Sequence, residues 1–222
     1  MEQDVEQVLD LIAARRPKTG RTIIAIAGPP ASGKSTLAEA VVLRLNAKRE
    51  SSVPGAVLLP MDGYHLDNRL LEARGLLRKK GAPETFNARD FCDAVLRLKS
   101  TNEETFHPRF DRQMDLAIAN AIAIHPETPV VIVEGNYLLL RAEPWAGLHA
   151  EYTATVFVCP KMDQLKDRLK QRWIRHGYDP DAAAQRASAN DLPNAELVFA
   201  ESAPADLHLT QDYGEPGVRY AF

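Results

Sequence analysis

Cysteine is scarce in this 222-residue sequence, which contains only Cys92 and Cys159. Neither has a partner at the spacing of metal ligands, so a disulfide framework or a zinc cluster is not expected. Two free thiols fit a reducing compartment. Apolar runs are shorter than the roughly 20 residues that a membrane span needs, and the acidic start, Met1 to Asp4, differs from a secretory signal. We expect a cytoplasmic protein without membrane insertion.

An excess of positive charge is also missing. The 27 Lys and Arg residues against 30 Asp and Glu residues give a formal net charge of -3. Because no general basic surface is available to neutralise a phosphate backbone, we do not expect a nucleic-acid partner. A small anionic substrate needs only a local cluster of Lys and Arg and is still allowed. No repeat or linker is visible, so we expect one domain over residues 1–222, of unknown oligomeric state.

Short β-branched and apolar runs predict the strands of a parallel sheet that is buried on both faces. They are residues 22–27, 56–59, 130–135 and 155–159, with a last short strand at 207–209. Segments with helical spacing alternate with these runs, and Asn87 is a predicted N-cap. This alternation predicts an α/β fold with helices on both faces of the sheet. The polar and aromatic segment 105–112 is predicted to be a loop.

A complete P-loop, or Walker A motif, follows the first predicted strand and precedes a helix. Its spacing is G-x-x-x-x-G-K-S, in which glycines let the backbone present N–H groups to phosphates at the positive end of the helix. We expect Lys34 to reach the β- and γ-phosphates and Ser35 to ligate Mg²⁺. The expected nucleotide-binding residues are Gly28, Pro29, Pro30, Ala31, Ser32, Gly33, Lys34, Ser35 and Thr36.

Acidic residues lie at the ends of two further strands. Glu134 ends the third predicted strand, where an acid in a P-loop protein holds Mg²⁺ directly or through water. Asp62 follows the second strand, where a carboxylate can orient an acceptor hydroxyl and take its proton. The alternatives are a loop-capping acid and an ordinary Asp-Gly turn. The Asn-Lys-x-Asp signature of GTPases and the Ser-Gly-Gly signature of transporter ATPases are absent, which favours a kinase.

Several segments together resemble a family of P-loop kinases that includes uridine kinase, phosphoribulokinase and type I pantothenate kinase. They occur in the family's order and span most of the chain: 28–35, Met61-Asp62-Gly63-Tyr64, 81–87, Phe106-His107-Pro108-Arg109-Phe110-Asp111, and 133–139. The nearest resemblance is to a bacterial subgroup described as fructose-transport-system kinases. The resemblance implies the three-layer P-loop sandwich, ATP as donor, Mg²⁺, and a sugar hydroxyl as acceptor.

The resemblance also implies roles for individual residues. Asp62 is the expected catalytic base, Lys34 and Ser35 serve the nucleotide and Mg²⁺, and Glu134 is the second acid. Residues expected near the acceptor are Asp62, Tyr64, His65, His107, Arg109 and Glu134. The Tyr64-His65 pair departs from the uridine kinase and pantothenate kinase patterns, which argues against both substrates.

A charged helix is predicted over 161–175, and with the next helical segment it would form a lid at about 161–202. Arg168, Arg172 and Arg175 share one face of this helix, and the family has an arginine-bearing lid here. We expect Arg172 and Arg175 to support phosphoryl transfer; the alternative is a solvated basic face. Asn190 and Asn194 are expected either to contact a ligand or to cap a helix-turn-helix.

The sequence therefore predicts an ATP- and Mg²⁺-dependent kinase that acts on a hydroxyl of a small molecule, with a sugar as the first candidate. Uridine and pantothenate are the alternative acceptors. A different class also fits a P-loop, namely a regulatory protein that hydrolyses ATP in association with a transport system.

Overall fold

A five-stranded parallel sheet forms the centre of the computed structural model, which describes residues 1–47 and 51–210. The strand order is β2-β5-β1-β6-β7. The strands are β1 (Thr22–Ala27), β2 (Ala56–Pro60), β5 (Val130–Gly135), β6 (Ala154–Val158) and β7 (Leu207–Leu209). Every residue of β1 and β5 is buried, as expected when helices cover both faces. The predicted α/β fold is confirmed.

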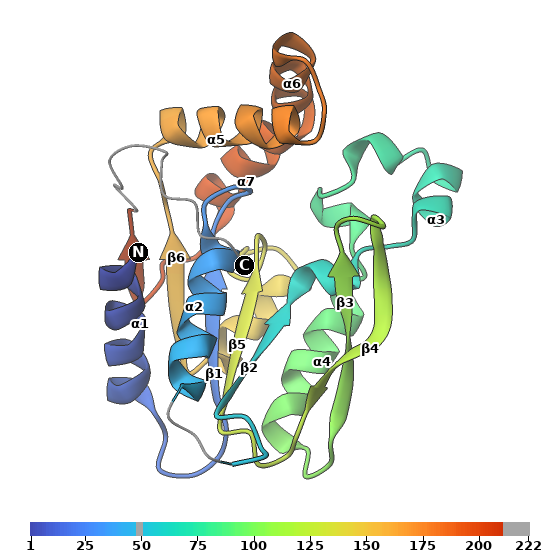
Figure 1. The fold of residues 1–222 in the computed structure, drawn as a ribbon. Coiled ribbons are helices and arrows are strands. Elements are labelled where there is room, and N and C mark those ends of the chain that lie inside the picture. The colour runs from blue at the N-terminus through green and yellow to red at the C-terminus, as the bar shows by residue number, and fades with distance from the viewer. Residues whose placement is uncertain (48–50, 211–222) are drawn as a thin grey trace.

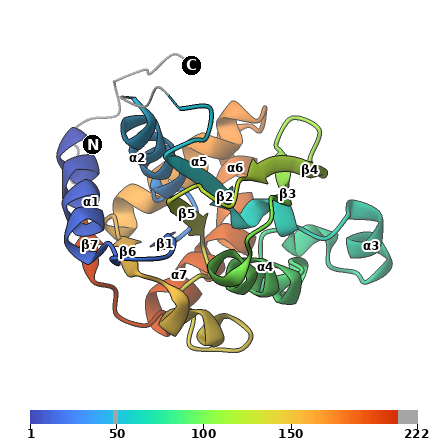
Figure 2. The same ribbon diagram turned by 90° about the horizontal axis from the view of Figure 1, so that it is seen from below.

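Side chains of β1 alternate between two apolar layers. Ile24 and Ile26 belong to the layer that contains α1 (Glu2–Arg15) and α2 (Lys34–Asn46). Ile23 and Ala25 face the opposite layer. That layer is built from α4 (Ala88–Ser100), the 3₁₀ helix η4 (Trp145–Glu151) and α7 (Leu192–Glu201). Figure 2 shows these helices on the two sides of the sheet.

Further helices gather at the end of the sheet where the central strands finish. Figure 1 shows α5 and α6 above this end, and α3 beside them. Their bounds are α3 (Asn68–Ala73), α5 (Met162–Arg175) and α6 (Pro180–Arg186), with a π-helical turn, η5 (Ala187–Asp191), leading into α7. Short 3₁₀ helices are η1 (Met61–Tyr64), η2 (Leu77–Lys79) and η3 (Pro83–Thr85). The predicted helical stretch 180–202 is confirmed as α6, η5 and α7.

The strand register aligns three strand ends that carry polar residues. Glu134 of β5 is level with Ile26 of β1 on one side and with Pro60 of β2 on the other. Gly28 follows β1 directly, and Asp62 follows β2 by two residues. The carboxyl ends of parallel strands therefore bring the P-loop, Glu134 and Asp62 to one edge, as is usual for ligand sites in such sheets.

The prediction of a loop at 105–112 is wrong. The segment forms β3 (Thr105–Asp111), which pairs antiparallel with β4 (Leu116–Ile124) in a separate hairpin. Pro108 obscured the strand because it cannot donate to the ladder, and the structure accommodates it at a register shift between His107 and Arg109. Most of β4 is exposed, yet Asn120 is its one polar residue, so the strand lacks the alternation of apolar and polar residues that marks a half-buried strand.

Two other local predictions, the N-cap at Asn87 and the free cysteines, are confirmed. The Asn87 side chain accepts a hydrogen bond from the backbone N–H of Asp90 at 3.4 Å and caps α4. Cys92 and Cys159 are both free thiols. In the part of the chain that the structure describes, no helix has the length and apolar character needed to cross a membrane.

Gly63 lets the hairpin approach η1 closely, and this contact gives a first prediction. A Cβ atom at Gly63 would lie 2.3 Å from the backbone O of Pro108. We expect Gly63→Ala to lower the free energy of unfolding by about 1–3 kcal/mol, because backbone must move to relieve the overlap. Gly147→Ala is the control, since its Cβ would have no neighbour closer than 3.9 Å. Equal urea midpoints for the two variants would contradict this account.

Candidate active site

The start of the P-loop lies against β6, the neighbour of β1 in the sheet. A Cβ atom at Gly28 would lie 2.5 Å from the backbone O of Val158 in β6, so a larger residue cannot take its place without a shift. Gly33 has a φ of 92° and is the N-cap of α2. This left-handed conformation favours glycine. The two glycines thus allow the loop to turn sharply from β1 into α2.

The loop has hydrogen-bonding groups that fit a polyphosphate. The first backbone N–H groups of any helix lack intrahelical acceptors, and no side chain in the described part of the chain caps the N-terminus of α2. These N–H groups form an anion site. The Ser32 hydroxyl is fully buried without a partner among the described residues. Lys34 adds a cation at the same place. These donors fit the phosphates of a nucleoside triphosphate.

Lys34 and Glu134 form a buried ion pair, with 3.6 Å between Nζ and Oε1. Burial lowers the pKa of Lys34, and the charge of Glu134 opposes this shift. Burial raises the pKa of Glu134, opposed by Lys34 and by a hydrogen bond from Ser35. Ser35 and Glu134 therefore place a hydroxyl and a carboxylate oxygen side by side. Oxygen ligands of this kind fit Mg²⁺.

Asp62 lies in η1 beside this pair, with 31% of its side chain exposed. Burial acts to raise the pKa of Asp62, but neighbouring basic groups outweigh it and lower the pKa below its ordinary value. In order of effect, these groups are His65, Lys34, Arg112 and Arg172. A carboxylate that stays ionised and partly open to solvent can accept a hydrogen bond from a hydroxyl.

His65 supports the backbone around Asp62. Its Nδ1 lies 2.8 Å from the backbone O of Asp62. Its ring packs against Phe86 and Phe110, with ring centroids 4.0 Å and 4.7 Å away. The sequence predicts that His65 lies near the phosphoryl acceptor. The structure brings it next to Asp62, in contact with both η1 and the hairpin.

Tyr64 and His107 are buried together on another side of η1. The Tyr64 hydroxyl lies 3.1 Å from His107 Nδ1, and His107 Nε2 lies 2.9 Å from the Thr105 hydroxyl. The Tyr64 ring meets Phe91 of α4 edge-on. These contacts join the hairpin to the core. Arg109, by contrast, is exposed on β3. Contact of these three residues with an acceptor stays a prediction.

Lys80 fixes the tip of the hairpin. Its ammonium donates to Asn68 Oδ1 at 2.6 Å and to Asp115 at 2.8 Å (Oδ1) and 2.9 Å (backbone O). It also lies 4.8 Å from the ring centroid of Phe110. Only 12% of the Lys80 side chain is exposed. The segment before η3 and the hairpin tip are therefore held together.

The arginines of α5 lie at different distances from the strand ends. Arg168 donates to the backbone O of Ser32 in the P-loop at 3.2 Å. Arg172 is close enough to Lys34 and Asp62 for its charge to lower the pKa of both. Arg175 is exposed and bonds to the backbone O of Gln171. The structure therefore brings Arg168 and Arg172 to the site, and it shows no contact of Arg175 with the site among the described residues.

The π-helical turn η5 connects this helical segment to the other side of the site. Asn190 donates to the backbone O of Lys80 at 2.9 Å, and Arg186 donates to the backbone O of Arg78 at 2.8 Å. Asp191 accepts a hydrogen bond from Trp173 Nε1 at 2.5 Å. Asn194 is buried in α7. Asn190 and Arg186 thus join this helical segment to residues 78–80, and a ligand contact or a cap by Asn190 and Asn194 stays a prediction.

Three residues of this region were not selected from the sequence as site residues: Lys80, Arg112 and Arg168. Arg168 shares a helix face with Arg172, so its spacing was a usable signal. Arg112 lies in a segment read as a loop, and its approach to Asp62 depends on the hairpin. Nothing in the local sequence of Lys80 indicates that it meets Asp115.

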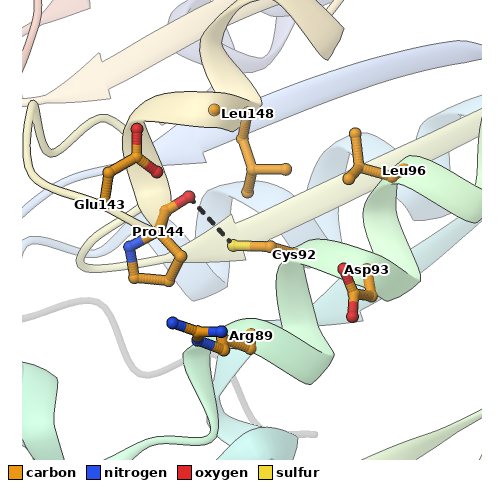
Figure 3. Close-up of a pocket in the computed structure, with 8 residues that line it drawn as sticks. Arg89, Cys92, Asp93, Leu96, Glu143, Pro144 and Leu148 are labelled. Atoms are coloured by element: carbon orange, nitrogen blue, oxygen red, sulfur yellow. Dashed lines mark hydrogen bonds between the residues drawn. The ribbon is translucent and has the colours of Figure 1, made fainter.

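A hollow of 530 Å³ lies elsewhere, between α4 and η4. Figure 3 shows Cys92 on its wall, donating to the backbone O of Pro144 at 3.5 Å. Burial raises the pKa of Cys92 to about 12, so its thiolate form is rare near neutral pH. None of the lining residues belongs to the P-loop or the strand ends.

No protein-family model matches the chain, but individual proteins do. A solved structure from Silicibacter sp. TM1040, described as a "putative fructose transport system kinase", is 44% identical with a TM-score of 0.85, covering 92% of this chain and 98% of that one. The "uncharacterized protein YggC" of Escherichia coli K12 is 34% identical, over 84% of this chain and 76% of that protein. A "putative uridine kinase" of Schizosaccharomyces pombe is 30% identical, over 86% and 83%.

The contacts of Lys80 give a second prediction. Lys80→Met keeps the length of the side chain but removes its hydrogen bonds to Asn68 and Asp115. We expect the free energy of unfolding to fall by about 1–3 kcal/mol, and amide hydrogen exchange at residues 112–115 to become faster. Lys79→Met is the matched control, because Lys79 is 64% exposed and has only a 3.8 Å contact to Glu84 among the described residues. Unchanged exchange at the hairpin tip in Lys80→Met would refute this role.

Proposed function

Since the chain belongs to the P-loop kinase family that includes uridine kinase, phosphoribulokinase and pantothenate kinase, we propose that it transfers the γ-phosphoryl group of ATP to a hydroxyl group of a small molecule. The observation that carries this proposal is Asp62 at the end of β2, beside the Lys34–Glu134 pair. A sugar is the first acceptor class to test, because the 44% identical protein is described as a fructose transport system kinase.

On this proposal, the donor side holds the nucleotide through the P-loop. The backbone N–H groups at the start of α2 and the Lys34 ammonium bind the phosphates. Ser35 and Glu134 would hold Mg²⁺, directly or through water. When bound, Mg²⁺ neutralises charge on the phosphate oxygens. The buried position of Lys34 and Glu134 keeps these groups fixed before the nucleotide arrives, so little reorganisation is needed.

Asp62 is the proposed catalytic base. It would accept a hydrogen bond from the acceptor hydroxyl, orient the oxygen toward the γ-phosphate and take its proton as the new bond forms. Its lowered pKa keeps the carboxylate ionised near neutral pH, so it is available as an acceptor. His65 holds the backbone of Asp62, and its partners Phe86 and Phe110 exclude water from that side.

The helical segment 161–202 is the proposed lid. Arg172 is proposed to stabilise the charge that spreads over the phosphoryl oxygens during transfer. Arg168, which contacts the P-loop carbonyl of Ser32, supports the same side. Arg175 would have to turn inward from the end of α5 to contribute. Closure of such a segment excludes water and limits hydrolysis of ATP.

Other functions fit the same donor site. Uridine and pantothenate are the alternative acceptors within the kinase class. A regulatory ATPase associated with a transport system is the alternative from another class. An acceptor panel separates the classes: a kinase releases ADP faster when its acceptor is present, whereas the regulatory ATPase responds to a protein partner and to no small hydroxyl compound.

The role of Asp62 gives a third prediction. Asp62→Asn keeps the shape but cannot take a proton, so we expect kcat on the best panel acceptor to fall by about 10²- to 10⁴-fold. The dissociation constant of a non-hydrolysable ATP analogue should stay within about twofold, because the P-loop is intact. Asp10→Asn, on the exposed face of α1, is the control. An unchanged kcat in Asp62→Asn would show that Asp62 is not the catalytic base.

The role of Glu134 gives a fourth prediction. We expect a chelator to abolish transfer, and Glu134→Gln to raise the Mg²⁺ concentration for half-maximal activity by about tenfold or more. The amide keeps the side-chain shape but not the charge. Glu127→Gln, exposed just before the start of β5, is the matched control. An unchanged Mg²⁺ requirement in Glu134→Gln would remove Glu134 from the metal site.

A further inference from the structure

Arg112 approaches the proposed base from the tip of the hairpin. It directly follows the last residue of β3, and its Nη2 lies 3.4 Å from Asp62 Oδ2. The Arg112 side chain is 62% exposed. Within residues 1–47 and 51–210, Asp62 is its one hydrogen-bonding or ion-pair partner. Arg112 is thus a mostly exposed cation whose partner is the group that must meet the acceptor.

Three other cations of the region are held by different groups. Lys34 pairs with Glu134, Lys80 pairs with Asp115, and Arg168 bonds to the backbone of the P-loop. The nearest acid in the sequence, Asp111, accepts hydrogen bonds from the backbone N–H groups of Gln113 and Met114 at 2.9 Å. The hairpin tip therefore offers Arg112 no second side-chain acceptor among the described residues.

The contact between Arg112 and Asp62 is easily exchanged. It is single, long and exposed to solvent, and such ion pairs contribute little. A guanidinium binds much better to a phosphate or carboxylate through two parallel hydrogen bonds. The acceptor hydroxyl must also come within hydrogen-bonding distance of the Asp62 carboxylate, where Arg112 now lies. An anionic group next to that hydroxyl would draw Arg112 away and leave the carboxylate free.

The hairpin tip is held in a fixed position. Lys80 binds both the side chain and the backbone of Asp115, three residues after Arg112. Because this anchor restrains the backbone of the tip, Arg112 can change its hydrogen-bonding partner by a movement of its side chain alone. The anion would then be bound a short distance from Asp62, on the acceptor side of the P-loop.

We propose that Arg112 exchanges Asp62 for an anionic group of the acceptor, so that the site selects small hydroxyl compounds that already carry a phosphate or a carboxylate. The inference rests on the proposed function, because it concerns the acceptor of that reaction. A phosphorylated sugar and a hydroxy acid share the chemistry that Arg112 recognises.

Matched acceptor pairs test the proposal. Fructose and fructose 6-phosphate differ by a phosphate, and pantothenol and pantothenate differ by a carboxylate. For the pair that is phosphorylated, we expect the anionic member to have a kcat/KM at least tenfold higher. Arg112→Gln should reduce this ratio at least tenfold, chiefly by raising KM for the anionic member. Arg112→Lys should give an intermediate ratio, and the exposed Arg74→Gln should leave it unchanged. Equal use of both members by the native protein would overturn the proposal.

A binding measurement decides the proposal even if no panel member is phosphorylated. With the donor site saturated by a non-hydrolysable ATP analogue and Mg²⁺, inorganic phosphate should raise the Tm of the native protein, relative to sodium chloride at equal ionic strength. Arg112→Gln should lose this rise, and Arg74→Gln should keep it. An equal rise in Arg112→Gln, or none in the native protein, refutes the anion site. Failure of every acceptor to stimulate ADP release would instead refute the proposed function.

Discussion

The buried ion pair between Lys34 and Glu134 is the interaction on which the rest of the site depends. Lys34 opens α2, directly after the loop that leaves β1, and Glu134 lies in the neighbouring strand β5. Loss of one partner would leave a buried charge without compensation, which typically costs about 3–5 kcal/mol. The pairing of Ile26 with Glu134 must therefore be kept, since a slip of one residue would turn the carboxylate to the other face of the sheet.

The proposed donor side and the proposed acceptor side of the site differ in how they are built. The donor side consists of buried strand ends and the start of α2, so its geometry follows from the core. The acceptor side is assembled from η1, the segment around Lys80 and the exposed hairpin, which meet through side-chain contacts such as Lys80 to Asp115. These contacts can change with less effect on the core. This division fits a family in which one way of binding ATP serves different acceptors.

The same division explains what the sequence could predict. The strands, the P-loop, Glu134 and Asp62 were readable because buried parallel strands form continuous apolar runs, and the motif has fixed spacing. The hairpin was missed because Pro108 and the exposed face of β4 hide its periodicity. Lys80 and Arg112 act through partners 35 and 50 residues away. Such contacts depend on how the hairpin packs, and no local pattern reports them.

The helical segment that begins with α5 touches both sides of the site. Arg168 binds the backbone O of Ser32 on the donor side, and Asn190 binds the backbone O of Lys80 on the acceptor side. Lys80 in turn holds the hairpin tip, which carries Arg112 to Asp62. A displacement of this segment must break these contacts or carry both sides with it. The positions of the P-loop and of the proposed base are therefore linked through the backbone O atoms of Ser32 and Lys80 and through the Lys80 side chain, which holds the hairpin tip.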